Sequence, residues 1–209
     1  MQGITQGQMQ TDKVIALICA LRDALSARNQ LEVVKLTVSR LSALTLDGRA
    51  TEPLRAPPPH FESELALAIS HIPDSLNAVA EALSQARPYL DWRADIGGDD
   101  SYYEKGSDVG LSFREGNLVC SLVGPANSFV FSEDLFLSLF FLKSRTLYRD
   151  HVHQASEMYF NLSGPCGFRL GDQDWVDYAG DSVIWTPPLA PHATRVYETP
   201  FLSAVSWVS

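Results

Sequence analysis

The sequence predicts a mainly β protein in which a C-terminal barrel follows an N-terminal α-helical region. Two observations predict this fold class. Apolar residues recur at helical spacing over roughly the first 90 residues, whereas from about residue 109 the chain breaks into short β-rich runs separated by Gly, Asp, Asn and Pro. We therefore expect a helical region over residues 1–95 that packs on a β-barrel domain over residues 96–209.

Composition excludes several classes of function. The 209 residues are 45% hydrophobic, enough for a sizeable core, and the formal net charge is −9. No basic run is present, which argues against a nucleic-acid partner. Met1 to Gln10 lacks the basic and apolar parts of a secretory signal, and runs such as Leu135 to Leu142 are too short to span a bilayer. These features predict a cytoplasmic protein with no membrane partner.

Cysteine usage agrees with a reducing compartment. Cys19, Cys120 and Cys166 are far apart and form no CxxC pair. A disulfide framework or zinc knuckle is therefore not expected, and buried reduced thiols are.

The helical expectation depends on periodicity and on prolines. Val14, Leu17, Ile18, Leu21 and Leu25 predict a first helix, which Asn29 interrupts. A second helix is predicted to end near Asp47-Gly48, before a proline-rich linker over 51–60. Two further helices are expected over Glu62 to Ser70 and Ser75 to Ala86, each bounded by proline.

The strand expectation depends on short β-rich runs. Many such runs at close spacing are typical of a barrel or sandwich. The expected strands are Asn117 to Val123, Leu135 to Leu142, Met158 to Leu162, Gly167 to Leu170, Ser182 to Trp185 and Phe201 to Val208.

Three of the five histidines lie in two short segments. His151 and His153 are two residues apart, the spacing at which side chains share a face of a strand. Glu157 follows after a turn, and Tyr159 lies two residues further on the same face. Downstream, a proline-rich loop presents His192 to the interior. Imidazole and carboxylate bind divalent ions well, so His151, His153, Glu157 and His192 together predict one metal site.

The two segments resemble the two motifs of the cupin superfamily. The first motif, His-x-His, three residues, Glu, six residues, Gly, fits His151 to Gly164 without a gap. The second, Pro-x-Gly-x-x-His, fits Pro187 to His192 except that Leu189 replaces the glycine. Arg145 stands at the opening glycine of the first motif and Val196 at the closing asparagine of the second. The resemblance implies a double-stranded β-helix (jelly-roll) barrel, and the departures affect turns rather than ligands.

Surrounding residues are similar to those of cupin-type dimethylsulfoniopropionate (DMSP) lyases, strongly over roughly residues 120–209 and in layout before that. The similarity implies cleavage of DMSP, a small-molecule substrate, into dimethyl sulfide and acrylate by β-elimination. The matching segments are Tyr148-x-x-His151-x-His153-x-Ala155-x-Glu157-x-Tyr159-x-x-Leu162-Ser163-Gly164, Phe168-Arg169-x-Gly171-Asp172-x-x-Trp175, Pro-x-x-x-x-His192-Ala193-x-Arg195 and Leu202 to Trp207.

The resemblance also implies roles for single residues. Tyr159 is the expected catalytic base and a further candidate metal ligand, since a nearby cation lowers the pKa of a phenol. Tyr148 would orient the substrate carboxylate or assist proton transfer. His151 would be a metal ligand or a substrate-binding residue just outside the ligand set. Trp207 is the best placed aromatic for the sulfonium cation. Other candidates for that contact are Trp185, Trp92, Tyr102 and Tyr103, the last two in a segment that could cover the barrel mouth.

Two other classes of function stay open on the sequence. One is an Fe(II) cupin dioxygenase with the same four ligands, which oxygen dependence would distinguish. The other is a non-enzymatic cupin that binds a small ligand. The ligand types permit Zn, Fe, Mn, Ni or Co. Because cupins often dimerise through barrel edge strands, a homodimer is one option for the assembly.

Overall fold

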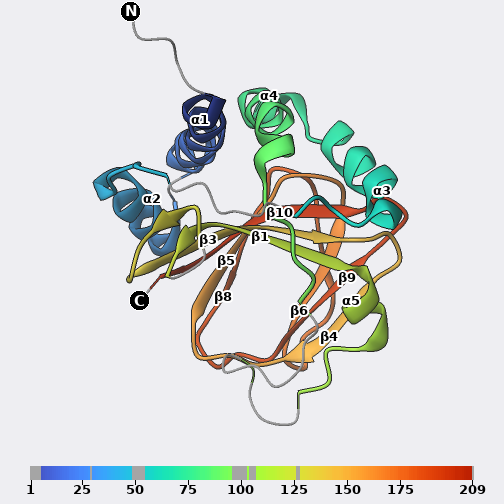
Figure 1. The fold of residues 1–209 in the computed structure, drawn as a ribbon. Helices are drawn as coiled ribbons and strands as arrows, with labels where there is room; N and C mark the ends of the chain where they lie inside the picture. The colour runs from blue at the N-terminus through green and yellow to red at the C-terminus, as the bar shows by residue number, and fades with distance from the viewer. Residues whose placement is uncertain are drawn as a thin grey trace, which may run out of the picture.

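A group of helices lies on one side of a β-barrel (Figure 1). The computed structural model describes residues 6–28, 30–48, 55–95, 103, 107–125 and 128–208. The helices are α1 (Gln6–Ser26), α2 (Glu32–Ala43), α3 (Pro59–Ser70), η1 (Asp74–Leu76), α4 (Asn77–Ala86), η2 (Arg87–Tyr89) and α5 (Leu111–Gly116). The strands are β1 (Asn117–Gly124), β2 (Val130–Phe131), β3 (Leu135–Leu142), β4 (Leu147–His151), β5 (Ser156–Asn161), β6 (Cys166–Leu170), β7 (Val176–Tyr178), β8 (Val183–Thr186), β9 (His192–Val196) and β10 (Phe201–Val208).

The strands form two sheets that enclose the barrel interior. The six-stranded sheet has the order β2-β1-β3-β10-β5-β8, and the four-stranded sheet has the order β4-β9-β6-β7. All pairings are antiparallel except that of the short β2 with β1. The predicted class, a mainly β cupin-type barrel with an N-terminal helical region, is confirmed.

Alternation along the six-stranded sheet separates two cores. In β5, Met158 and Phe160 face the helices, whereas Tyr159 faces the barrel interior. In β10, Leu202 and Ala204 likewise join the helix-side core, whereas Phe201 and Val205 join the interior core. Both faces of this sheet are therefore buried, which explains the almost continuous apolar sequence of β3.

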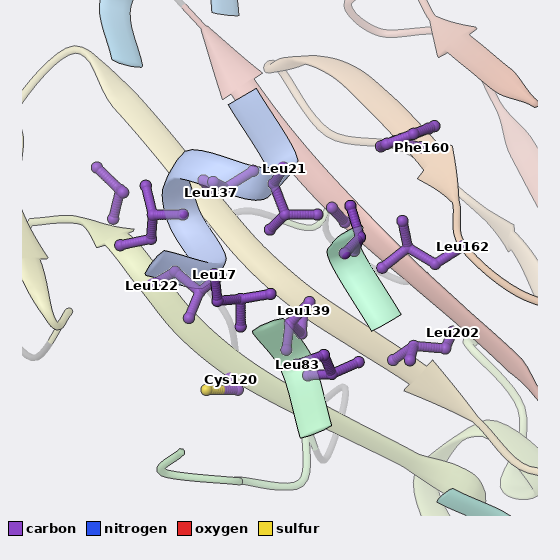
Figure 2. Close-up of a cluster of buried hydrophobic side chains, with 14 of the residues drawn as sticks. Leu17, Leu21, Leu83, Cys120, Leu122, Leu137, Leu139, Phe160, Leu162 and Leu202 are labelled. Carbon is purple, nitrogen blue, oxygen red and sulfur yellow. The ribbon is translucent and has the colours of Figure 1, made fainter. Parts of the chain in front are cut away.

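Helices α1 and α4 cover the outer face of the six-stranded sheet (Figure 2). Leu17 and Leu21 of α1 and Leu83 of α4 lie over Leu122, Leu137 and Leu139 of β1 and β3, and all six side chains are fully buried. Beyond the end of α1, an ion pair joins Arg28 to Asp181 just before β8. No helix among the described residues combines the length and apolarity needed to cross a membrane.

Helix boundaries agree with the sequence in part. Pro59 is the first residue of α3, where its missing N–H costs no hydrogen bond, so the helix takes the last residues of the predicted linker. The second helix was predicted to end near Asp47-Gly48; this is wrong, because α2 ends at Ala43 and Leu44 is extended. Residues 29, 51–54 and 96–102 fall outside the described ones, so the domain boundary between residues 95 and 96 stays a prediction.

Two predicted strands have the expected bounds, β3 and β10. Four others are displaced by one or two residues. Among the described elements, β2, β7, β9 and α5 have no counterpart among the predicted strands and helices. The strand expected to carry both His151 and His153 on one face is also wrong, because β4 ends at His151 after a register shift that begins at Tyr148. His153 belongs to the following loop.

All three cysteines are free, as predicted. Cys120 and Cys166 are buried and Cys19 is half-buried. Burial raises the pKa of both the Cys120 and the Cys166 thiol to about 12. These two thiols stay protonated at ordinary pH and are poor ligands and nucleophiles.

Candidate metal centre

Four buried side chains meet at one end of the barrel. His151 ends β4, His153 lies in the loop that follows, Glu157 lies near the start of β5 and His192 starts β9. The pairing of β4 with β9 places His151 opposite His192. The possible ligand atoms of the three histidines all lie within 4.8 Å of one another. Oε2 of Glu157 lies 3.2 Å from Nε2 of His153 and 3.2 Å from Nε2 of His192.

Backbone carbonyl groups determine which nitrogen of each imidazole carries a proton. Nδ1 of His151 lies 2.8 Å from the carbonyl oxygen of Arg149, Nδ1 of His153 3.1 Å from that of Ala155, and Nδ1 of His192 2.9 Å from that of Ala190. A carbonyl oxygen can only accept, so each Nδ1 donates. The Nε2 lone pairs are then available to a metal ion, and the carbonyl groups orient the rings.

Two of the three Nε2 atoms lack a hydrogen-bond partner among the described residues, while that of His153 is hydrogen-bonded to Glu157. Those of His151 and His192 are buried and make no hydrogen bond to any described residue. His192 Nε2 is close to Glu157 Oε2, but the pair does not have hydrogen-bond geometry. Because an unpaired buried polar atom costs about 1–3 kcal/mol, such atoms call for a ligand. Three neutral imidazoles and one carboxylate are the donors that a divalent transition metal prefers, so the residues fit a metal ion.

Electrostatics support the same assignment. Burial alone would raise the pKa of Glu157, but the imidazoles of His153 and His192 beside it hold that pKa well below its usual range. The carboxylate is therefore ionised. Burial, with a contribution from neighbouring His192, lowers the pKa of His151 to about 3, so this imidazole is neutral. Burial lowers the pKa of His153, but Glu157 outweighs it and the net change is upward. A metal ion would replace the proton that His153 otherwise shares with Glu157.

The two predicted catalytic tyrosines line the barrel interior next to the four side chains. Tyr159 is two residues beyond Glu157 on the same face of β5, and its ring centroid lies 5.3 Å from that of Phe168. The ring of Tyr148 stacks on that of His151, with centroids 3.8 Å apart, and on that of Phe113 at the same distance. Both tyrosines are buried. The structure thus brings all the predicted ligands and both tyrosines to one place.

The aromatic residues proposed for a cation divide into two groups. Trp207 lies at the site: its indole N–H donates to Oε1 of Glu157 at 2.8 Å, and its ring centroid is 5.1 Å from that of His153. Tyr103 also lies there, hydrogen-bonded to Tyr148 through the hydroxyl groups. The candidate role of Trp185 is wrong, because its side chain is 44% exposed. It points to the face of β8 opposite to that of Ile184, which faces the interior. Trp92 is wrong because it packs in the helix-side core. Tyr102 is outside the described residues.

The two glycine replacements in the motifs keep a glycine-like backbone. Leu189 and Arg145 both have φ of 59°, in the left-handed region. For a residue with a side chain this conformation costs about 1–2 kcal/mol. The N–H of Leu189 donates to the carbonyl oxygen of His153 at 3.0 Å, so the strained turn connects the loop before His192 to the loop that carries His153. The departures from the motif therefore leave the ligand geometry intact.

Several aromatic residues of the site were not predicted as site residues from the sequence. The aromatic wall of the interior includes Phe113, Phe140, Phe168 and Phe201. Residues an even number of positions apart in a strand share a face. If Trp207 faces the interior, Phe201 in the same strand does so too. Phe168 in β6 could be assigned in the same way from an inward-facing His192. Phe113 lies on α5, outside any strand pattern, and only the fold brings it to Tyr148.

Comparisons with known proteins agree on one family. Residues 14–203 match the sequence profile of the DMSP lyase family. The curated dimethylsulfoniopropionate lyase DddQ of Ruegeria pomeroyi is 27% identical over 130 residues, which are 62% of this chain and 60% of that protein's length. The match therefore spans less than two thirds of this relative.

Two solved structures extend the likeness over almost the whole chain. The crystal structure of DMSP lyase DddQ from Ruegeria pomeroyi DSS-3 has a TM-score of 0.67 at 23% identity, covering 96% of this chain and 91% of that one. A structure from work on the DMSP lyases RdDddP and RnDddQII has a TM-score of 0.68 at 21% identity, covering 96% and 94%. At these identities the likeness shows the shared fold.

Proposed function

The chain belongs to the DMSP lyase family, and from this premise we propose that it cleaves DMSP into dimethyl sulfide and acrylate. The observation that carries the proposal is the buried set His151, His153, Glu157 and His192 next to Tyr159. The reaction is a β-elimination, which needs a base for the proton α to the carboxylate. It also needs stabilisation of the negative charge that develops there.

His153, Glu157 and His192 would hold one divalent ion, with His151 as a fourth ligand or as a substrate contact. The support is the unpartnered Nε2 atoms of His151 and His192 and the two 3.2 Å approaches of Glu157 to imidazole nitrogens. When bound, such an ion supplies a Lewis acid for the substrate carboxylate and lowers the pKa of a neighbouring phenol. The donor set suits Zn, Fe, Mn, Ni or Co.

Tyr159 acts as the base in this proposal. Its phenolate oxygen takes the proton from the carbon next to the carboxylate. The electron pair of that C–H bond forms the carbon–carbon double bond of acrylate. The C–S bond breaks, and its electron pair leaves with sulfur as neutral dimethyl sulfide. Tyr159 is suited to this because it is buried two residues from Glu157 on the same strand face, where water is scarce.

Tyr148, His151 and Trp207 would bind and orient the substrate. Tyr148 stacks on His151 and forms a hydrogen bond with Tyr103, so its position is held from both sides. The aromatic wall of the interior offers ring faces to the sulfonium group, each worth about 0.5–2 kcal/mol. The predicted cytoplasmic location and homodimer stay predictions.

The test is release of dimethyl sulfide from DMSP by the purified protein, measured by headspace gas chromatography. We expect release by metal-loaded protein, loss of release after chelation and recovery when the metal is returned. Rates under air and under argon should agree, because an elimination consumes no oxygen. Oxygen-dependent turnover without dimethyl sulfide would support the Fe(II) dioxygenase instead. No dimethyl sulfide from any metal-loaded form would refute the proposal.

A further inference from the structure

Two buried hydroxyl groups next to the metal centre make no hydrogen bond within the described chain. They are Oγ1 of Thr186, near the end of β8, and Oγ1 of Thr194, in β9. Both side chains are completely buried. A valine of the same shape would fill either position without leaving a polar atom unpaired, so each buried hydroxyl group calls for a partner.

Strand register places Thr186 beside the carboxylate ligand. Thr186 is the cross-strand neighbour of Glu157 in the pairing of β5 with β8. Directly opposite residues of an antiparallel pair have Cβ atoms about 4.5–5.5 Å apart. Thr186 also shares its face with Ile184, which belongs to the interior core. Its hydroxyl group is therefore on the barrel interior at the level of the metal ligands.

Thr194 lies further into the barrel than the predicted metal ligands, by one inward-facing position along its strand. It is two residues beyond His192 in β9 and shares that inward face with Val196. Its cross-strand neighbours are Tyr148 in β4 and Phe168 in β6. The Thr194 hydroxyl group therefore lies between two parts of the site. The predicted metal ligands are on one side of it, and the part of the interior lined by Tyr148 and Tyr159 is on the other. A third unpaired interior hydroxyl, that of Ser203, is opposite Asn161 and Phe140, further from the ligands.

The chemistry of the proposed substrate identifies what these hydroxyl groups bind. DMSP has one hydrogen-bond acceptor group, its carboxylate, while its sulfonium end accepts no hydrogen bond. We infer that Thr186 and Thr194 are substrate-binding residues whose hydroxyl groups donate to the carboxylate of the substrate. This inference rests on the proposed function, because it takes the substrate from it. The carboxylate would lie between Thr186, at the level of the ligands, and Thr194, two residues further along the inward face of β9, with its α carbon toward Tyr159.

The test uses Thr186→Val and Thr194→Val, which keep side-chain shape and remove the hydroxyl group. The probes are acrylate, which has the carboxylate, and trimethylsulfonium, which has only the cation. Each is titrated calorimetrically into metal-loaded protein. We expect each variant to bind acrylate about ten- to a hundredfold more weakly, the usual effect of one lost hydrogen bond to a charged group. Binding of trimethylsulfonium should not change.

Thr37→Val is the matched control. Thr37 is also fully buried, but its hydroxyl group donates to the carbonyl oxygen of Val33 at 2.8 Å and lies 2.9 Å from Oγ of Ser206, on the helix side of the sheet. Its loss should lower the Tm of the metal-free protein by about 2–4 °C and leave acrylate binding unchanged. The two interior variants should melt at or above the wild-type Tm, because valine removes an unpaired polar atom.

Two results would overturn the inference. One is acrylate binding equal to wild type in both interior variants; a lowered Tm beside it would identify structural hydroxyl groups. The other is no binding of acrylate by metal-loaded wild type. Failure of the proposed function has a different signature: no release of dimethyl sulfide by wild type, while acrylate binding still depends on the two threonines.

Discussion

The indole N–H of Trp207 donates to Oε1 of Glu157 at 2.8 Å across the pairing of β10 with β5, while Oε2 of the same carboxylate approaches His153 and His192. The two oxygens of Glu157 therefore have different tasks. One is held by the neighbouring strand, and the other is directed at the imidazoles. A hydrogen-bonded partner of this kind orients a ligand and tunes its affinity for metal.

Trp207→Phe should weaken metal binding by about ten- to a hundredfold, because the phenyl ring fills much of the space but cannot donate to Glu157. Competition with a chromophoric chelator measures the change. Trp175→Phe is the control, since the Trp175 ring contacts the guanidinium groups of Arg169 and Arg195 and none of the predicted ligands. Equal metal affinity of wild type and Trp207→Phe would contradict this role.

Tyr159→Phe should lower turnover of DMSP by about a hundredfold or more, because general base catalysis contributes on that scale. Metal content, measured by plasma emission spectrometry, should stay close to wild type, since His and Glu ligands remain. Tyr89→Phe, in η2 on the helix side, controls for loss of a phenol. An active Tyr159→Phe variant would remove Tyr159 as the base.

Leu189→Gly should raise the free energy of unfolding by about 0.5–1 kcal/mol. Glycine relieves the left-handed strain but increases the entropy of the unfolded chain, and the first effect is larger. Leu189→Ala keeps the strain and trims a side chain that is 56% exposed, so it should change stability little. Denaturant unfolding compares the two. A less stable glycine variant would show that the leucine side chain contributes more than the strain.

Asp181→Asn should destabilise the protein by about 1–2 kcal/mol at neutral pH, because Asp181 pairs with Arg28 and accepts from Ser75 at 2.6 Å. Burial acts in the opposite direction, but these two partners hold the pKa of the carboxyl below its ordinary 3.8. The unfolded chain thus binds the proton more readily. The extra stability of wild type over Asp181→Asn is fully present above about pH 5. It is lost as the pH falls through the lowered pKa of Asp181.

The measurement is the free energy of unfolding of both proteins from pH 7 to pH 3. Their difference should narrow as the pH falls. Asp174→Asn, at an exposed position, should show no such convergence. A constant difference between wild type and Asp181→Asn would mean that the ion pair contributes nothing that depends on the charge of Asp181.

Leu21→Ala should cost about 2–5 kcal/mol, because Leu21 is fully buried between α1 and the six-stranded sheet. If the helices and the barrel share that core, the variant should unfold in one transition at a lower denaturant concentration than wild type. The helical circular dichroism and the near-ultraviolet signal of the tryptophans should then disappear together. Leu36→Ala, at a position 39% exposed, is the control. Two separate transitions would instead support independent units on the two sides of residue 95.

The sequence predicted those helices and strands whose apolar residues follow a clear local pattern. The strands β3 and β10 are almost wholly apolar because both faces of their sheet are buried, so their bounds were correct. The strand β9 was missed and β4 was predicted with wrong bounds, because histidine, tyrosine and threonine occupy inward positions in these strands and arginines occupy outward ones. These inward polar side chains leave the two strands without the apolar pattern that would have revealed them.

The candidate site was predicted from ligand types and spacing, but its contacts depend on register. The resemblance favoured Trp207 over Trp185, but only the alternation of β8 and β10 shows that Trp207 points inward and Trp185 outward. For the same reason Thr186 and Thr194 could not be connected with Glu157 and Tyr148 before the strand pairs were known. The proposed contact of Trp207 with the substrate stays a prediction beside its hydrogen bond to Glu157.

The position of β10 has a consequence for how the protein acquires its structure. This strand is the last of the ten among the described residues, yet it lies between β3 and β5 in the six-stranded sheet. During synthesis, β3 and β5 emerge from the ribosome well before the strand that joins them. Such non-local pairing makes folding slow, and it leaves two sheet edges open to misfolding partners in the meantime. The hydrogen bond from Trp207 to Glu157 forms only when β10 inserts, so a nascent chain would complete the candidate site at the end of folding.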